Sequence, residues 1–154
     1  MLGPMVNPSK PKKQMVGVFS LELARLYNYI YQAGEKQYVI LHSDDGYDEI
    51  SLTGTYRAIS REGQQINSPE DMGLRRLKAE ELFGGATISE AAEIFLNVLR
   101  NECPDAHRQV VCANAGTAIH CVDPSKPLLD CVAMARESIE SGRAYSSFKK
   151  LIAA

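Results

Sequence analysis

QMVGVFSLELARLYNYIYQAGEKQYVILHS, residues 14–43, contains two apolar segments separated by a segment with helical periodicity. Residues 14–20 and 37–43 are short and rich in β-branched or aromatic side chains, which predicts two strands buried on both faces. Between them, Ser20 can cap a helix whose apolar side chains recur at helical spacing until Gly34. A strand, a helix and a strand in this order predict a βαβ unit with parallel strands.

Downstream of this unit the sequence predicts a hairpin and then a helical region. Residues 50–60 and 64–66 have strand character with Glu62-Gly63 between them, and a bulge near Gly54 is compatible with the pattern. Residues 68–77 are expected to form a loop. Thr87 and Glu90 have the spacing of a capping box. We expect helices after Thr87, over residues 105–122 and 128–141, and over about 145–152. The fold class is therefore α/β, with a sheet, flanking helices and one domain over residues 1–154.

Composition sets broad limits on function. The chain has 154 residues, of which 45% are hydrophobic and 23% charged, and this predicts one globular domain. The formal net charge is -2, so the chain lacks the excess positive charge that is typical of proteins that bind nucleic acid. We find neither a secretory signal nor a membrane-spanning apolar run, so we expect a cytoplasmic protein that binds no membrane. The four cysteines lie nine or ten residues apart, which is typical of neither zinc sites nor redox motifs and predicts buried free thiols.

The acidic segment after the second strand is the strongest candidate for a functional site. Asp44, Asp45, Asp48 and Glu49 place four carboxylates within six residues, beside Gly46. In open α/β sheets, ligands bind outside the carboxyl ends of the strands, where this segment should lie. Adjacent Asp48 and Glu49 suit Mg²⁺, provided that the loop turns both side chains to one side. An exposed acidic turn without a ligand is the alternative that the spacing leaves open.

Other residues that could carry chemistry have simpler interpretations. His42 stands next to the acidic segment, where it could assist a metal site, but a hydrogen-bonded core histidine at a strand end is the favoured interpretation. His107 and His120 lie on predicted helices and are interpreted as structural. Gly84-Gly85 lacks the lysine and hydroxyl residue of a nucleotide loop and is interpreted as a turn. Tyr27 and Tyr31 share one helix face, which favours core packing over base stacking.

Three motifs in order and spacing resemble one known family, the anthranilate phosphoribosyltransferases. The motifs are LGPMVNP at residues 2–8, QMVGVF at 14–19 and HSDDGYDEIS at 42–51. Weaker agreement continues through Gly84-Gly85, Asn114-Ala115 and residues 135–144. The resemblance covers the whole chain, whereas the chain corresponds to about the second half of the length of a family member.

The resemblance implies a fold and an activity. The fold would be the C-terminal portion of a phosphoribosyltransferase or nucleoside phosphorylase-like catalytic domain. Members of the family use Mg²⁺ to transfer the phosphoribosyl group of PRPP to anthranilate in tryptophan biosynthesis, and they form homodimers through an N-terminal helical domain. By resemblance, Asp48 and Glu49 are the metal ligands for the pyrophosphate, and Asp44 and Asp45 are not. The family's PRPP loop, its Lys-His-Gly-Asn stretch and its anthranilate-binding arginine have no counterpart here, so catalytic and substrate-binding residues stay unassigned.

The Gly-Pro-rich opening of the chain, residues 2–8, indicates a truncated protein, because such a turn seldom stands first. Because the family motifs that position the substrates have no counterpart here, we expect a polypeptide of these residues alone to lack useful activity. Two alternatives remain at this stage. One is a non-catalytic relative that binds nucleic acid, which the net charge and the Asp48-Glu49 pair disfavour. The other is one half of a split enzyme, whose exposed sheet edge and apolar faces would associate with a separate polypeptide.

Overall fold

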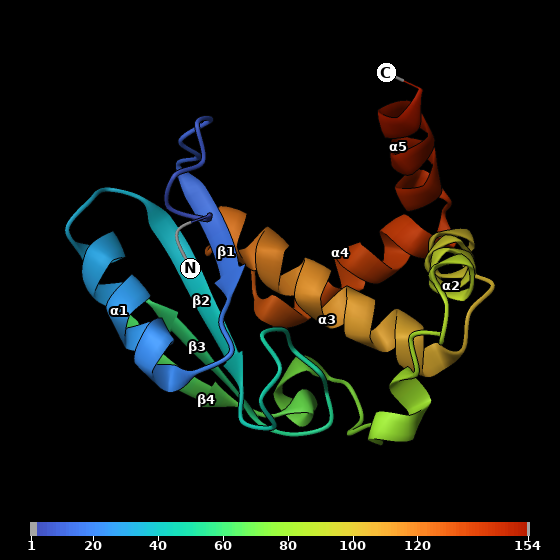
Figure 1. Cartoon of the computed structure of the whole chain (residues 1–154), viewed down its shortest axis with the longest axis horizontal. Coiled ribbons are helices and arrows are strands. Elements are labelled where there is room, and N and C mark those ends of the chain that lie inside the picture. The colour runs from blue at the N-terminus through green and yellow to red at the C-terminus, as the bar shows by residue number, and fades with distance from the viewer. Residues whose placement is uncertain (1–2, 154) are drawn as a thin grey trace.

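The computed structural model describes residues 3–153 and contains one mixed sheet with helices on both of its faces (Figure 1). The four strands are hydrogen-bonded in the order β1-β2-β3-β4. Helix α1 lies on one side of the sheet, and α3 crosses the other side with α4 packed against it (Figure 1). The predicted α/β class is confirmed, and Leu2 of the LGPMVNP motif lies outside the described residues.

The predicted βαβ unit is present. It consists of β1 (Lys13–Gly17), α1 (Leu21–Gln32) and β2 (Gln37–Ser43), and β1 pairs with β2 in parallel. Ser20 caps α1 as expected, because its Oγ accepts a hydrogen bond from the Leu23 N–H at 3.2 Å. The expectation that the first strand runs over residues 14–20 with both faces buried was wrong. β1 ends at Gly17 and is partly exposed, because it pairs with β2 alone and forms an edge of the described sheet.

The predicted hairpin is shorter than expected. β3 (Tyr56–Ser60) and β4 (Gly63–Asn67) pair antiparallel across a turn at residues 61–62, rather than at Glu62-Gly63. Residues 50–55 form no strand and no bulge at Gly54. The physical reason is that this segment has other partners: the backbone of Ile50 bonds to a side chain on α3, and Leu52 has a left-handed φ of 62°.

The C-terminal half is helical, as predicted. Two short 3₁₀ helices come first, Pro69–Met72 and Ala79–Leu82, of which the former lies in the expected loop 68–77. The helices that follow are α2 (Ile88–Arg100), α3 (Asp105–Val122), α4 (Leu128–Glu140) and α5 (Arg143–Ile152). Thr87 caps α2 by accepting from the Glu90 N–H at 3.2 Å. The reciprocal half of the predicted capping box is replaced, because the Glu90 carboxylate accepts from the Ala86 N–H instead.

Two hydrophobic cores lie on opposite faces of the sheet, and β2 contributes to both. Alternate side chains of a strand point to opposite faces. Tyr38 and Ile40 therefore pack with α1, whereas Leu41 packs with α3, α4 and the segment after β2. The acidic segment is thus anchored to the larger core through the buried residues Ile50 and Leu52.

All four cysteines are free thiols, and three of them, Cys112, Cys121 and Cys131, are buried as predicted. Within residues 3–153, no helix combines the length and the apolar character needed to cross a membrane.

Candidate functional site

The acidic loop, defined here as residues 44–55, follows the carboxyl end of β2 and folds back over the end of β1. Gly46 has a φ of +95°, which lets the chain reverse, and its N–H donates to the Ser43 carbonyl oxygen at 3.0 Å. The backbone of Asp48 lies directly against Gly17, because a Cβ added to Gly17 would stand 1.5 Å from the Asp48 carbonyl oxygen. The absence of a side chain at Gly17 therefore allows the loop to cover the end of β1.

Asp44 is engaged in fixing the base of the acidic loop. Its carboxylate accepts from Thr55 Oγ1 at 2.6 Å and from Arg57 Nε at 2.9 Å. The hydrogen bond from Thr55, together with the hydrogen bond and charge of Arg57, holds the pKa of Asp44 below its ordinary value. Asp44 is thus a structural link between β3 and the loop.

Asp45 is engaged in the same way within the loop. Its Oδ2 accepts from Ser51 Oγ at 2.7 Å and also from Thr53 Oγ1. The two hydroxyl groups lie 2.9 Å from each other, so the three side chains form one cluster. Its second oxygen lies 3.5 Å from the Tyr47 N–H. Asp45 therefore shapes the turn.

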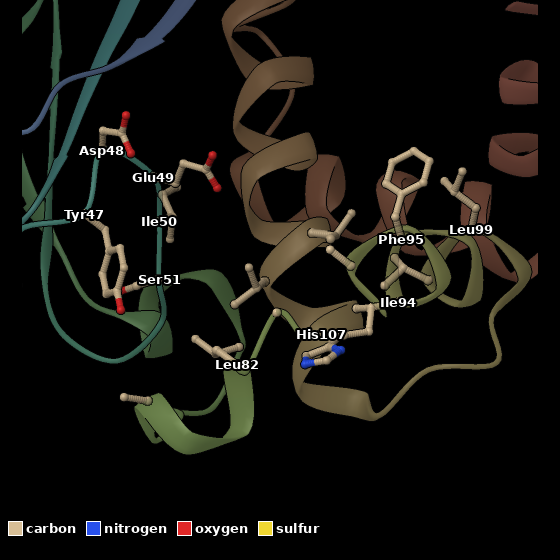
Figure 2. Close-up of a pocket in the computed structure, with 16 residues that line it drawn as sticks. Tyr47, Asp48, Glu49, Ile50, Ser51, Leu82, Ile94, Phe95, Leu99 and His107 are labelled. Atoms are coloured by element: carbon tan, nitrogen blue, oxygen red, sulfur yellow. The ribbon is translucent and has the colours of Figure 1, made fainter. Parts of the chain in front are cut away.

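Asp48 and Glu49 differ from these two residues. In the part of the chain that the structure describes, neither carboxylate has a hydrogen-bond or ion-pair partner, and both residues are exposed. Figure 2 shows both carboxylates on the same side of the loop, with the Tyr47 side chain directed the other way. The condition that we set for a shared metal, two adjacent side chains on one side, is therefore met.

These two residues fit Mg²⁺ as an incomplete ligand set. Mg²⁺ usually binds one or two carboxylates and completes its octahedron with water and substrate phosphate oxygens. Among residues 3–153, no group of three or more His, Cys, Asp or Glu side chains could hold a metal by itself. The donor set therefore suits an ion that arrives with a phosphorylated ligand, and does not suit a closed structural site.

A cavity of about 520 Å³ opens beside the two carboxylates (Figure 2). The acidic loop forms one wall, and α2 and α3 form the opposite wall. Ile94, Phe95 and Leu99 of α2 face this space, which explains why the apolar face of that helix is only partly buried. The site thus combines an acidic rim with an apolar wall.

Most of the histidines and tyrosines singled out in the sequence have the structural role expected for them, and His107 differs. His42 is buried and its Nδ1 lies 2.9 Å from the Val18 carbonyl oxygen, so it takes no part in the acidic rim. His120 Nδ1 lies 2.8 Å from the Lys126 carbonyl oxygen. His107 instead lines the cavity, and its Nδ1 is buried with no hydrogen-bond partner among the described residues. Tyr27 and Tyr31 pack edge to face in the core, with their ring centroids 5.9 Å apart.

Sequence reasoning missed the residues that hold the acidic loop in place. The side chain of Asn114, on α3, makes two hydrogen bonds with the backbone of Ile50. Its signal in the sequence was an asparagine in the interior of an apolar helix, a position that asparagine disfavours. Ser51 and Thr53 had no signal, because serine and threonine are common in any loop.

Comparison with known proteins places the chain in a family. The sequence model of the family described as "Glycosyl transferase family, a/b domain" matches residues 1–145. The chain is 50% identical over 152 residues to the anthranilate phosphoribosyltransferase of Cytophaga hutchinsonii, covering 99% of this chain and 46% of that protein. It is 53% identical over 151 residues to the corresponding enzyme of Christiangramia forsetii, covering 98% and 45%. The chain thus spans about half the length of the curated relatives that it matches.

Solved structures agree with the fold. The anthranilate phosphoribosyltransferase of Thermus thermophilus superposes with a TM-score of 0.87 at 30% identity, covering 99% of this chain and 46% of that one. The Saccharomyces cerevisiae enzyme in complex with PRPP and Mg superposes with a TM-score of 0.82, covering 96% and 43%. At 21% identity the yeast structure shows the fold alone.

Proposed function

The chain belongs to the glycosyl transferase family defined by this α/β domain, and from that premise we propose that it supplies the magnesium-binding part of an anthranilate phosphoribosyltransferase. Such an enzyme transfers the phosphoribosyl group of PRPP to anthranilate in tryptophan biosynthesis, and we expect it in the cytoplasm. The observation that carries the proposal is the pair of unpartnered carboxylates, Asp48 and Glu49, beside a cavity at the carboxyl end of β2. Magnesium is the metal proposed because the yeast enzyme of the same fold was solved with PRPP and Mg.

Within this proposal, Asp48 and Glu49 hold Mg²⁺, and through it the pyrophosphate of PRPP. The bound ion would neutralise negative charge on the pyrophosphate as it leaves the ribose. The chain's own contribution is orientation: Asp44 and Asp45 are satisfied by hydroxyl groups and Arg57, so the loop presents only two of its four carboxylates to the ligand. The wall formed by α2 and α3 makes one side of the cavity apolar.

The remaining substrate contacts belong, in this proposal, to the part of the relatives that this chain does not match. That part makes up more than half of each relative, since the chain covers 46% of the Cytophaga hutchinsonii enzyme. Catalytic residues and the anthranilate site therefore stay unassigned in residues 1–154. The homodimer expected from the resemblance also stays a prediction.

Calorimetric titration of the chain with Mg²⁺ and inorganic pyrophosphate tests the proposal. We expect magnesium-dependent binding that Asp48→Asn and Glu49→Gln each weaken about 10-fold or more, because each removes a charged ligand from a site that has only two. Asp130→Asn, an exposed change on α4 with the same loss of charge, is the matched control and should bind as the unsubstituted chain does. Binding that is indifferent to Mg²⁺, or equal in all variants, would reject the site.

A further inference from the structure

Ile50, the residue directly after Glu49, has an unusual backbone environment. It is fully buried and lies outside every strand and helix of the described chain. Its N–H donates to Asn114 Oδ1 at 3.0 Å, and its carbonyl oxygen accepts from Asn114 Nδ2 at 2.9 Å. One side chain from α3 thus satisfies both polar groups of this residue, as a neighbouring strand would do.

This contact requires a carboxamide at position 114. Only asparagine and glutamine carry an amide N–H donor and a carbonyl acceptor side by side on one planar group, and glutamine would place that group one methylene farther from α3. Asn114 Nδ2 also donates to the Val110 carbonyl oxygen at 3.0 Å, one turn earlier on the same helix, which orients the amide toward the loop. Ile50 and Asn114 are separated by 64 positions in the sequence, which makes this a tertiary contact, not a local turn.

The opposite side of the acidic loop is fixed as well. The backbone of Asp48 rests on Gly17 at the end of β1. After Ile50 the chain passes through Leu52, whose φ of 62° is unfavourable for a leucine and whose side chain is fully buried. Such a conformation persists only where surrounding contacts enforce it. On the α3 side, the contact made closest to Glu49 along the loop is the one between Asn114 and Ile50.

We propose that Asn114 is a positioning residue for the metal site: it fixes the Ile50 backbone and so holds Asp48 and Glu49 in the orientation that binds Mg²⁺ with pyrophosphate. The inference rests on the proposed function, since it concerns the same two carboxylates. Residues that orient metal ligands without touching the metal commonly change metal affinity about 10- to 100-fold when they are substituted. Asn114 meets that description, because it binds the backbone of Ile50, the residue directly after Glu49.

The test uses the whole 154-residue chain with Asn114→Ala and, as the matched control, Thr117→Val. Thr117 is a buried polar residue one turn later on α3, and within residues 3–153 its hydroxyl bonds only inside the helix, to the Ala113 carbonyl oxygen. We expect Asn114→Ala to weaken binding of Mg²⁺ with pyrophosphate about 10-fold or more. Thr117→Val should leave that affinity within about twofold, because it leaves the loop untouched. Hydrogen exchange at the Ile50 amide should accelerate in Asn114→Ala only.

A second substitution separates positioning from electrostatics and serves if Asn114→Ala does not fold. Asn114→Asp keeps the acceptor for the Ile50 N–H, loses the donor to the Ile50 carbonyl oxygen, and adds a negative charge near the site. Charge alone would tighten cation binding, whereas the positioning role predicts weaker binding and faster Ile50 exchange. If the unsubstituted chain binds but the Asn114 variants bind equally well or better, the role of Asn114 is refuted and the metal site stands. If the unsubstituted chain does not bind, both the metal site and the role of Asn114 are refuted.

Discussion

Four chemically similar carboxylates between positions 44 and 49 have two different kinds of surroundings. The carboxylates of Asp44 and Asp45 accept hydrogen bonds from the loop and from β3, whereas the carboxylates of Asp48 and Glu49 accept none among the described residues. Uncompensated carboxylates repel each other, so a neighbouring pair without partners is favourable mainly where a cation binds. This difference at residue scale is what distinguishes a candidate metal site from an ordinary acidic turn.

Gly17 offers a test of how the acidic loop is seated. Gly17→Ala should lower the free energy of unfolding by about 1–3 kcal/mol or more, because the new methyl group collides with the Asp48 backbone, which cannot rotate away. Gly84→Ala is the control, since no atom lies within 4 Å of its added methyl group, and it should stay within about 0.5 kcal/mol. Urea denaturation measures both. Equal stability of the two variants would mean that the loop does not rest on β1.

Asp44 predicts a specific pH dependence of stability. Its pKa is lowered in the folded chain, so the unfolded chain takes up the proton first as the pH falls. The stabilisation is therefore complete above the ordinary aspartate pKa of about 3.9 and is lost as the pH falls through the lower folded value. Asp44→Asn should remove this contribution to the loss of stability in acid. The contribution to the free energy of unfolding should be less than about 1 kcal/mol, because the pair with Arg57 is partly exposed. Thermal unfolding of both chains at a series of acidic pH values measures this difference. If the stability of Asp44→Asn fell with pH as steeply as that of the unsubstituted chain, the stabilising role of the Asp44 carboxylate would be contradicted.

At the scale of elements, the order of strands and helices followed from the sequence, because period and caps are local signals. The βαβ unit and the three long C-terminal helices were predicted for that reason. Residues 50–55 were predicted wrongly as strand, because their alternation of apolar and polar residues serves another purpose: Ile50 and Leu52 insert into the core while Ser51 and Thr53 turn to Asp45. Tertiary partners 64 residues away cannot be deduced from the local pattern.

The contact between α3 and α4 gives the prediction at this scale. Gly116 lies so close to Val132 that an added Cβ would stand 2.7–2.8 Å from the side chain and backbone of Val132. Replacing glycine by alanine in a helix normally stabilises it by about 1 kcal/mol. Gly116→Ala should instead destabilise the chain by about 1–3 kcal/mol, because the two helices must move apart.

Chemical denaturation of Gly116→Ala provides the measurement. Ala133→Gly, at an exposed position of α4, is the reference for helix propensity alone and should cost about 1 kcal/mol. A stabilised Gly116→Ala variant would show that the helices are not in close contact.

At the scale of the whole molecule, the chain presents a partly covered sheet and an open cavity. β1 is an edge of the described sheet, and the apolar residues of α2 that line the cavity are only partly buried. The chain matches less than half of the length of the Cytophaga hutchinsonii and Christiangramia forsetii relatives. The proposal that Asp48 and Glu49 are metal ligands came from the resemblance, because residue spacing alone left an acidic turn without a ligand open as the alternative. The absence of nucleic-acid binding, expected from the net charge, stays a prediction.

The most direct test joins the unmatched first part of the Cytophaga hutchinsonii relative to this chain and follows anthranilate fluorescence with PRPP and Mg²⁺. We predict turnover by the chimera, none by the 154-residue chain alone, and a fall of about 100-fold or more when Asp48→Asn and Glu49→Gln are combined. A folded chimera whose rate does not depend on these two carboxylates would contradict the account.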